Sequence, residues 1–514
     1  MSLTKATYSM IDGPQVNVKD YGAVADWNGS TGTDNTTAFA AAVAAIDALG
    51  GGTLTIPPGK YKGILAINTS NIHVIGYGAT IGYQNVDATL QVFPGSTTPY
   101  NYSFFGGFDS GGVPQHVSAN ATFYPINTVT QGSDTFTITS SSTGLAVGDW
   151  CMLMSGQQSN STVSTNHIPT SHQLVQIASV SGTTLTMQST SDISFNSSAV
   201  YPYLVKWNFL QNVKVSGLSF TDLAGGTAAY IYFVCGVNNA VFENISFYPG
   251  TAGGIFGTCQ NVKFQNVTSY GSFTGFSNGR MSDQITIKDS AVYSATSKSG
   301  TLQYYFFFSE ENVKRLTIDN CVGNNASIVI SGGSAWTTFK VVDCFFECYV
   351  SNLSALGVYS NTLGTFSFSN TSFVGKGGYG AYASQKGVCE IAYTTGQVLF
   401  NNCTVIQLDG VSNSVSGTTG STEVNVSDTQ INAPMVGVAG YSGVINTTEP
   451  ITIYDGINII NAAAAVPAGI SLGSSTASTV GVTGSASALP ANPLGYLIAY
   501  IGSTKVKIPY YTGT

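Results

Sequence analysis

A short motif recurs nine times between residues 215 and 431, and it restricts the architectures open to this chain. In each copy an apolar residue is followed two positions later by Asn, Asp or Gly, and three residues after that by a residue that is usually apolar. The first positions are Val215, Phe242, Phe264, Ile287, Ile318, Val341, Phe368, Phe400 and Val426. The turn positions are Gly217, Asn244, Asn266, Asp289, Asn320, Asp343, Asn370, Asn402 and Asp428. Successive copies lie 22 to 32 residues apart, a period typical of solenoids.

The residues within each copy predict strands on both sides of a turn. Side chains alternate with the period of two that marks a β-strand, so that polar Ser216 and Glu243 follow apolar Val215 and Phe242. Asn, Asp and Gly tolerate a left-handed backbone and therefore break the strand. One such strip cannot bury its own apolar face, but coils stacked about 4.8 Å apart bury it together. The sequence predicts an all-β fold, a right-handed parallel β-helix, because parallel crossovers favour that hand.

Two columns of this predicted solenoid invite a structural interpretation. We interpret the turn column as an asparagine ladder, and its members Asp289 and Asp343 as structural rather than catalytic. Just after the turn, Cys321, Cys344 and Cys403 share one inward column, where a buried cysteine acts as a small hydrophobe. The sequence contains no CxxC pair, so we expect no zinc site and no other metal.

Composition excludes several classes of partner. Only 8% of the residues are charged and the net charge is −8, which argues against nucleic acid because phosphate binding needs a basic face. No window holds 18 apolar residues, so we expect no membrane insertion. The first residues lack the apolar run of a signal peptide. A protein of this kind that works outside cells is expected to leave by lysis or on a particle.

Changes in pattern divide the chain into five segments. Residues 1–15 form an N-terminal leader, and residues 16–81 form an entry segment with a helix and the first coil. In that segment Phe39, Val43 and Ile46 recur at helical spacing after an N-cap signal at 34–37, and such a helix would cover the open first coil. Residues 82–205 hold an insertion with short β-strands, 206–435 the repeat body, and 436–514 a C-terminal β region that ends in a hairpin signal around 502–503.

Several stretches resemble a known superfamily. The run Asn17-Val18-Lys19-Asp20-Tyr21-Gly22-Ala23, the helix start Asp34-Asn35-Thr36 and the run from Gly51 to Tyr61 resemble the entry segment of the pectate-lyase superfamily, which is widespread in bacteriophage tailspikes. The leader at 3–11 and the ending at 495–511 are similar to phage tail proteins. Most of the chain outside the insertion is covered by this resemblance.

The resemblance implies a homotrimeric virion spike, with the C-terminal region in trimerisation, that acts at the bacterial cell surface. Its partners would be a bacterial surface polysaccharide (capsule or O-antigen), which it binds and usually cleaves, and a phage tail or adaptor protein. No large head-binding domain precedes the entry segment in this sequence, so we expect either attachment through an adaptor or an attachment domain that has been removed. The Asp clusters of calcium-dependent pectate lyases are also missing, so we expect no calcium and no other cofactor.

One outward column suggests where a polysaccharide binds. Next to the third apolar position it reads Thr221, Tyr248, Tyr270, Tyr293, Asn324, Glu347, Val374. Three tyrosines on consecutive coils would form a flat aromatic strip on which sugar rings stack, with Asn324 and Arg280 as further binding residues. The alternative is that the tyrosines pack under the insertion or against a neighbouring subunit.

Glycoside hydrolysis needs two carboxyl groups, which stacked coils can supply at suitable separations. Glu347 lies two coils from Tyr293 on the same face and is the strongest single candidate. Glu310 and Glu311 follow the aromatic run 304–308, where an apolar environment would raise a carboxyl pKa, although an ion pair between Arg280 and Glu311 explains the same residues. Asp319 faces outward as a partner carboxylate or as a solvated charge.

Two other functions remain open from the sequence. A polysaccharide lyase acting on a uronate would need a Tyr, His or Lys base and a neutralising cation, yet the chain has only Arg280 and Arg315 as arginines. His167 and His172 lie in the insertion and form no zinc motif, so we interpret them as loop histidines. A receptor-binding spike without catalysis would need the binding column alone.

Overall fold

The structure is a computed structural model of the whole chain. It describes residues 14–83, 104–106, 122–156, 169–192, 195–196, 201–206, 209–222, 230–248, 252–257, 259–271, 274–280, 282–294, 305–309, 313–330, 336–349, 354–358, 363–376, 387–391, 395–408, 413–417, 421–427, 429–431, 435–437, 445–447, 495–501 and 504–510. The chain divides into two compact units, Met1–Val466 and Pro467–Thr514.

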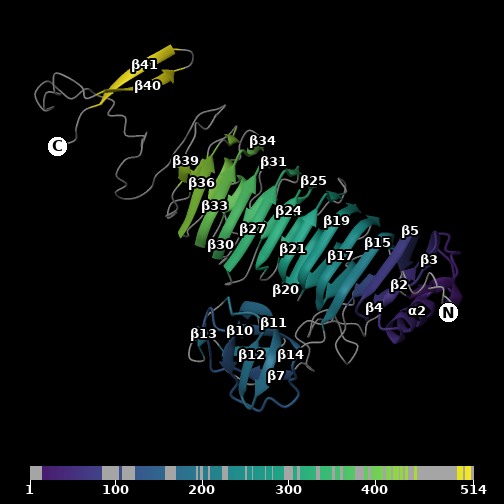
Figure 1. Cartoon of the computed structure of the whole chain (residues 1–514). Coiled ribbons are helices and arrows are strands. Elements are labelled where there is room, and N and C mark those ends of the chain that lie inside the picture. Colours follow the sequence, from purple (N-terminus) through teal and green to yellow (C-terminus); the bar gives the residue numbers. More distant parts are fainter. Residues whose placement is uncertain are drawn as a thin grey trace, which may run out of the picture. The chain divides into compact units, whose positions relative to one another are not determined.

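The first unit is a right-handed parallel β-helix with two long sheets, and its strands lie in successive coils like the rungs of a ladder (Figure 1). The 20-stranded sheet consists of β1 (Gln15–Asn17), β2 (Gly52–Thr55), β3 (Gly59–Lys62), β5 (Ile72–Tyr83), β15 (Leu210–Asp222), β17 (Val237–Tyr248), β19 (Gln260–Tyr270), β21 (Asp283–Lys288), β22 (Ala291–Tyr293), β24 (Arg315–Asp319), β25 (Val322–Asn324), β27 (Trp336–Val342), β28 (Phe345–Cys348), β30 (Leu363–Ser369), β31 (Ser372–Gly375), β33 (Thr395–Asn401), β34 (Thr404–Gln407), β36 (Ser421–Ser427), β37 (Gln430–Ile431) and β39 (Ile445–Thr447).

The second sheet of the solenoid has 11 parallel strands. They are β4 (Leu65–Ile67), β6 (Phe104–Gly106), β16 (Tyr230–Cys235), β18 (Ala252–Gly257), β20 (Thr274–Arg280), β23 (Tyr305–Ser309), β26 (Ser327–Ile330), β29 (Leu356–Val358), β32 (Gly387–Ile391), β35 (Asn413–Gly417) and β38 (Met435–Gly437). Strand β6 pairs with β4 and β16, so a strand of the solenoid lies within the stretch 82–205 that the sequence assigned to the insertion.

The predicted columns are confirmed by the register of the strands. Val215 pairs with Phe242, Phe242 with Phe264, and the same column continues without a shift to Val426. From Val215 to Phe400 these side chains fill the interior, where the rings of Phe242 and Phe264 stack with centroids 5.2 Å apart. Stacking equivalent apolar residues is what buries a face that one coil alone would expose.

The N-terminal end of the solenoid begins with a short 3-10 helix, η1 (Val18–Tyr21), and the helix α2 (Thr36–Ala48). Phe39, Val43 and Ile46 of α2 are buried in the core, as the helical spacing predicted. The side chain of Asp34, rather than that of the cap residue Asn35, accepts the backbone N–H of Thr36 at 2.9 Å. The helix contacts β4, β1 and β2, so it covers the first coils. No helix among the described residues is long and apolar enough to cross a membrane.

An antiparallel sheet lies between β5 and β15 in the sequence (Figure 1). Its six strands are β7 (Thr122–Pro125), β14 (Tyr201–Lys206), β10 (Trp150–Gly156), β11 (Pro169–Ser181), β12 (Thr184–Met187) and β9 (Thr135–Thr137), and β8 (Thr128–Val129) pairs with β13 (Phe195–Asn196). It has a core of its own, which includes Tyr124, Phe136, Val175 and Leu204.

Two residues connect this antiparallel sheet to the solenoid. His172 lies in β11, is fully buried, and contacts the carbonyl oxygen of Ser282 with its Nε2 at 3.2 Å. Lys314 donates to the carbonyl oxygen of His172 at 3.1 Å and pairs with Asp192 at 2.5 Å. The interpretation of His172 as a loop histidine is therefore wrong, because its ring is packed between two sheets. His167 lies outside the described residues.

The second unit contains the predicted C-terminal hairpin. Strand β40 (Gly495–Ile501) pairs antiparallel with β41 (Thr504–Tyr510) in a continuous register.

Candidate functional site

The turn column forms one edge of the candidate site and fixes its register. Each of its described members from Asn244 to Asn402 has a positive φ between 50° and 56°, the left-handed conformation that ends one strand and redirects the next. Their side chains bond along the column: Asn266 to Asn244 at 2.6 Å, Asn320 to Asp289 at 2.8 Å, Asn370 to Asp343 at 2.9 Å and Asn402 to Asn370 at 2.8 Å. Asp289 and Asp343 accept hydrogen bonds within this ladder, as the structural interpretation predicted.

A second asparagine ladder was missed from the sequence. Asn71, Asn212, Asn239 and Asn261 also have positive φ, and the amides of the last three each donate to the preceding member of the column, at 2.8, 2.6 and 3.2 Å. Asn239 and Asn261 lie five positions before Asn244 and Asn266, and that spacing is a signal that could have been found. Two parallel ladders fix both ends of the intervening strand, so the outward residues between them stay in register.

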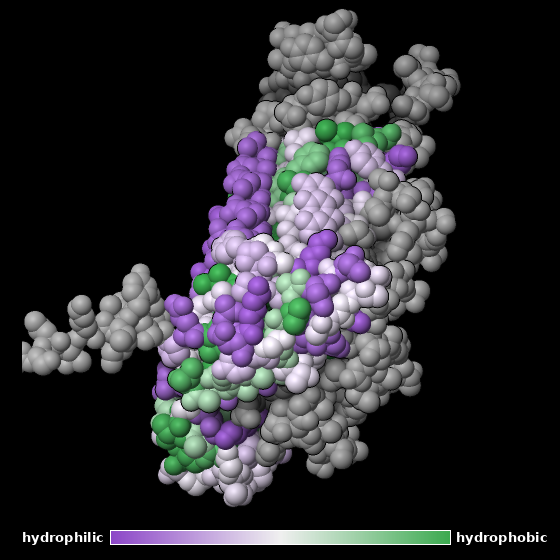
Figure 2. Space-filling view, turned by 90° about the vertical axis from the view of Figure 1, so that its right-hand side faces the viewer, coloured by the Kyte–Doolittle hydropathy of each residue, from purple (hydrophilic) through white to green (hydrophobic). Residues whose placement is uncertain are grey.

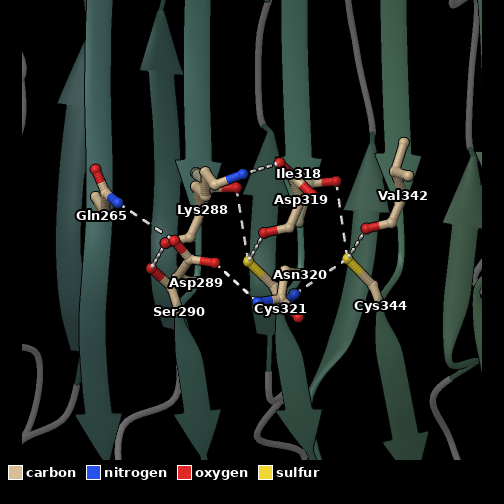
Figure 3. Close-up of polar contacts among 11 residues, drawn as sticks. Gln265, Lys288, Asp289, Ser290, Ile318, Asp319, Asn320, Cys321, Val342 and Cys344 are labelled. Carbon is tan, nitrogen blue, oxygen red and sulfur yellow. Dashed lines mark hydrogen bonds and ion pairs between the residues drawn. The ribbon is translucent and has the colours of Figure 1, made fainter.

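The side chain of the inward residue after each turn forms hydrogen bonds to the backbone as well as packing in the core (Figure 3). Cys321 donates its thiol to the carbonyl oxygen of Asp319, Cys344 to that of Val342, and Ser290 to that of Lys288, at 3.2, 3.0 and 2.7 Å. The carbonyl oxygens of Asp319 and Val342 also accept the backbone N–H of Asp289 and of Asn320 on the previous coil, each at 3.0 Å, so the thiols are second donors to these groups. The cysteines are buried, as expected, but they act as weak donors and acceptors rather than only as small hydrophobes.

The tyrosine column is in register on the outer face of the long sheet. Tyr248, Tyr270 and Tyr293 lie on consecutive coils, and 42%, 41% and 40% of their surfaces are exposed. The column begins at Thr221, which pairs with Tyr248, and continues from Tyr293 to Asn324. The chain itself therefore leaves these side chains open to solvent instead of packing them under the insertion. Figure 2 shows one face of the solenoid, on which hydrophilic side chains form a column beside apolar ones.

The tyrosine rings stack on one another, which differs from the expected flat strip. Adjacent centroids are 5.5 Å apart and the ring planes differ by only 13° and 15°. Coplanar rings placed edge to edge at that spacing would bring carbon atoms within about 3 Å, closer than the roughly 3.5 Å of a good contact. The rings are therefore offset-stacked. Tyr270 has a neighbour against each face, so the column offers ring edges and hydroxyl groups to a ligand.

Glu347 lies two coils beyond Tyr293, where it accepts two hydrogen bonds. Asn324 on the previous coil donates its amide to Oε1, and the Tyr349 hydroxyl donates to Oε2 at 2.7 Å. That bond to Glu347 raises the pKa of Tyr349. Both carboxyl oxygens of Glu347 therefore accept a hydrogen bond from a neighbouring side chain. Tyr349 was not among the predicted residues, although it lies two positions after Glu347 on an exposed stretch.

The other predicted site residues lie elsewhere. Asp319 pairs with Lys288 at 2.5 Å and is on the strand before the asparagine turn, whereas Glu347 is on the strand after the equivalent turn of its own coil. Asp319 is therefore an ion-paired surface residue and does not lie beside Glu347. Glu310 and Glu311 lie outside the described residues, and so does their proposed pairing with Arg280, whose backbone ends β20.

A further polar cluster lies on the first coils. His73 Nε2 lies 3.0 Å from Ser216 Oγ, which donates to Glu243 Oε1 at 2.9 Å, and Lys214 pairs with the same carboxylate at 2.9 Å. The Glu243 carboxyl is partly desolvated, but its bonds to Lys214 and Ser216 outweigh that and lower its pKa. Every polar group named here has a partner, so we interpret the cluster as a link between coils. Among the described residues no group of three or more His, Cys, Asp or Glu side chains is placed to hold a metal ion.

Comparisons with solved structures agree with this architecture. The chain is similar to the tailspike protein of Pseudomonas phage LKA1, with 14% identity and a TM-score of 0.50 over 86% of this chain and 81% of that one. It is also similar to the tailspike of Pseudomonas phage phi297, with 17% identity and a TM-score of 0.47 over 87% and 78%. The tailspike of Acinetobacter baumannii bacteriophage AP22, solved with an A. baumannii capsular saccharide, has 12% identity and a TM-score of 0.47 over 86% and 69%.

No protein-family model matches the chain, and no curated protein matches it in sequence. The likeness to the LKA1 tailspike concerns the fold alone. The chain has a tailspike-like, right-handed parallel β-helix, and its function has to be argued from its own residues.

Proposed function

We propose that this protein is a phage tailspike that binds a bacterial surface polysaccharide along the outer face of its long sheet and cleaves it by glycoside hydrolysis. The observation that carries the proposal is one register column, in which three exposed tyrosines lead through Asn324 to the carboxylate of Glu347. A polysaccharide is a periodic, hydroxyl-rich chain, and a ladder of polar side chains repeated on each coil is a periodic partner for it. A homotrimer carried on the virion, attached to a tail or adaptor protein, is part of this proposal.

Glu347 would act in its ionised form. Asn324 and Tyr349 donate to its two oxygens and so hold the carboxylate in one orientation. A held carboxylate can attack the anomeric carbon in a retaining enzyme or activate water in an inverting one. In either case a second, protonated carboxyl must donate a proton to the leaving oxygen. Glu310 and Glu311 remain the candidates for that role, and a site shared between two subunits is the alternative.

The test is to incubate the purified protein with capsule or O-antigen from candidate host strains. New reducing ends without an unsaturated uronate would support hydrolysis, and unsaturated products would identify a lyase instead. Binding without shortening of the polymer would identify a receptor-binding spike. In the hydrolase, Glu347→Gln should abolish cleavage while the protein still folds and assembles, and Asp319→Asn is the matched control that should keep activity. Full activity of Glu347→Gln would remove Glu347 from the site.

A further inference from the structure

A second outward column runs beside the tyrosines, two residues earlier on each strand. Its members pair coil by coil, in the order Ser246, Thr268, Ala291, Val322, Phe345, Ser372. The column is small or hydroxylated beside the tyrosines and becomes apolar beside Asn324 and Glu347. Val322 and Phe345 are 37% and 38% exposed, so they form an apolar surface beside the polar residues Asn324 and Glu347.

The ring of Phe345 differs from the tyrosine rings in its stacking contacts. Each tyrosine of the column stacks against another tyrosine, whereas among the described residues no ring stacks on Phe345. An exposed, unstacked phenyl ring on a flat sheet offers the kind of apolar surface that the apolar face of a pyranose covers. The stacking platform that the sequence placed on the tyrosines therefore has a better candidate one column away.

Phe345 and Glu347 are placed so that one sugar could contact both side chains. The two residues are two apart on β28 and face outward on the same side, so they are about 6.6 Å apart along the strand. A sugar ring lying over Phe345 and Val322 would have its polar edge toward Asn324 and its glycosidic oxygen within reach of Glu347. Tyr349, on the far side of Glu347, limits how far that sugar can move along the strand.

We propose that Phe345 and Val322 form the subsite that holds the sugar whose bond is cleaved, and that the tyrosine column binds the adjoining sugars through its hydroxyl groups. This inference rests on the proposed function. The sugar over Phe345 would be a neutral or amino pyranose, because a uronate there would bring a second carboxylate against Glu347.

The experiment begins with an array of purified bacterial capsular and O-antigen oligosaccharides, from which the tightest-binding glycan is taken as the probe. Its dissociation constant is measured by calorimetry for the full-length protein and for Phe345→Ala, Phe345→Trp and Leu408→Ala. Leu408 is an exposed apolar residue, 44% accessible, on a later coil outside the proposed subsite. Phe345→Ala should weaken binding about tenfold, Phe345→Trp should restore it to within about twofold, and Leu408→Ala should leave it unchanged.

The outcomes separate the two proposals. If wild type binds and Phe345→Ala binds equally well, this subsite is wrong while the proposed function stands. If Phe345→Ala changes the oligomeric state in light scattering and leaves glycan affinity intact, the apolar surface is an interface between copies and the inference is overturned. If no glycan on the array binds wild type, both proposals fail. Loss of binding when the uronates of the probe are reduced to neutral sugars would overturn the proposed sugar class.

Discussion

Cys321 and Cys344 occupy equivalent positions on consecutive coils, and the backbone N–H of Cys321 donates to Cys344 Sγ at 3.3 Å. The same contact recurs with oxygen in place of sulfur, from Cys344 N–H to Thr371 Oγ1 at 3.4 Å and from Val267 N–H to Ser290 Oγ at 3.1 Å. Sulfur and hydroxyl groups therefore serve one purpose in this column. They accept an amide from the previous coil and donate to a carbonyl on their own, and the carbonyls of Asp319 and Val342 also accept a backbone N–H from the previous coil.

The first prediction concerns that column. Cys344→Ser keeps a donor and an acceptor of similar size, so the free energy of unfolding should change by less than about 1 kcal/mol. Cys344→Val keeps the volume but leaves the Cys321 amide buried and unpaired, which should cost about 1–3 kcal/mol. Urea unfolding followed by circular dichroism measures both. Equal stability of the two variants would mean that the thiol acts only as a hydrophobe.

The second prediction concerns the one described turn position that holds Gly instead of Asn or Asp. Gly217 has φ 76°, and a Cβ added there would lie 2.5 Å from the ring of Tyr77. Tyr77 also accepts the side-chain amide of Asn244 at 3.1 Å, so its hydroxyl takes the place of a ladder asparagine. Gly217→Asn should cost about 1–3 kcal/mol because the new side chain meets this ring.

A double-mutant cycle tests that explanation. Adding Tyr77→Ala to Gly217→Asn removes the ring and lets the asparagine ladder continue through this coil, so the double variant should recover most of the loss. The coupling energy should be about 1 kcal/mol or more, since the two residues are in contact. Strictly additive effects in urea unfolding would contradict the proposed competition between ring and ladder.

The third prediction concerns thiol reactivity. Seven described cysteines are free and buried, and burial raises the pKa of Cys151 to about 12 and that of Cys389 well above its usual range. Thiolates are the reactive form, so native protein at pH 8 should react with Ellman's reagent at no more than one of its eight cysteines, the remaining one being Cys235. In urea all eight should react. Rapid modification of several thiols in the native state would show that the solenoid opens locally.

The long-range order of this fold could be predicted because each coil repeats the same local rule. An apolar residue, a turn residue and a second apolar residue at fixed offsets specify the pairing of Val215 with Phe242 and of Tyr293 with Asn324 without further information. Side-chain conformation carries no such repeat. The sequence places Tyr248 and Tyr270 on one face, but only the packing of the rings shows that they stack on each other.

The same limit applies to the candidate site. Glu347 was found because it lies in a periodic column, whereas Tyr349 contributes through a single hydrogen bond at the end of a strand. Phe345 was overlooked because no other residue from Ser246 to Ser372 in its column is aromatic, whereas the tyrosines repeat on consecutive coils. Glu310 and Glu311 belong to no copy of the repeat and lie outside the described residues, so their role stays a prediction.

The last prediction is a pH dependence of stability that depends on His172. Burial, with a smaller contribution from Lys314, lowers the pKa of His172 from 6.5 to about 4 against the opposing effects of Asp283 and Asp192. The unfolded chain therefore binds a proton near pH 6.5 that the folded protein does not bind until about pH 4. The free energy of unfolding should fall as pH decreases through this window, by up to about 3 kcal/mol.

Two variants separate this effect from general acid denaturation. His172→Gln keeps a donor toward the carbonyl oxygen of Ser282 and carries no proton to titrate, so its stability should fall less than that of wild type between pH 6.5 and pH 4. His73→Gln is the matched control, because His73 is only half-buried and its removal should leave most of the slope in place. Urea unfolding at a series of pH values gives the slopes. If His172→Gln and wild type lose stability in parallel, the buried histidine is not the group that makes the contact between the antiparallel sheet and the solenoid sensitive to acid.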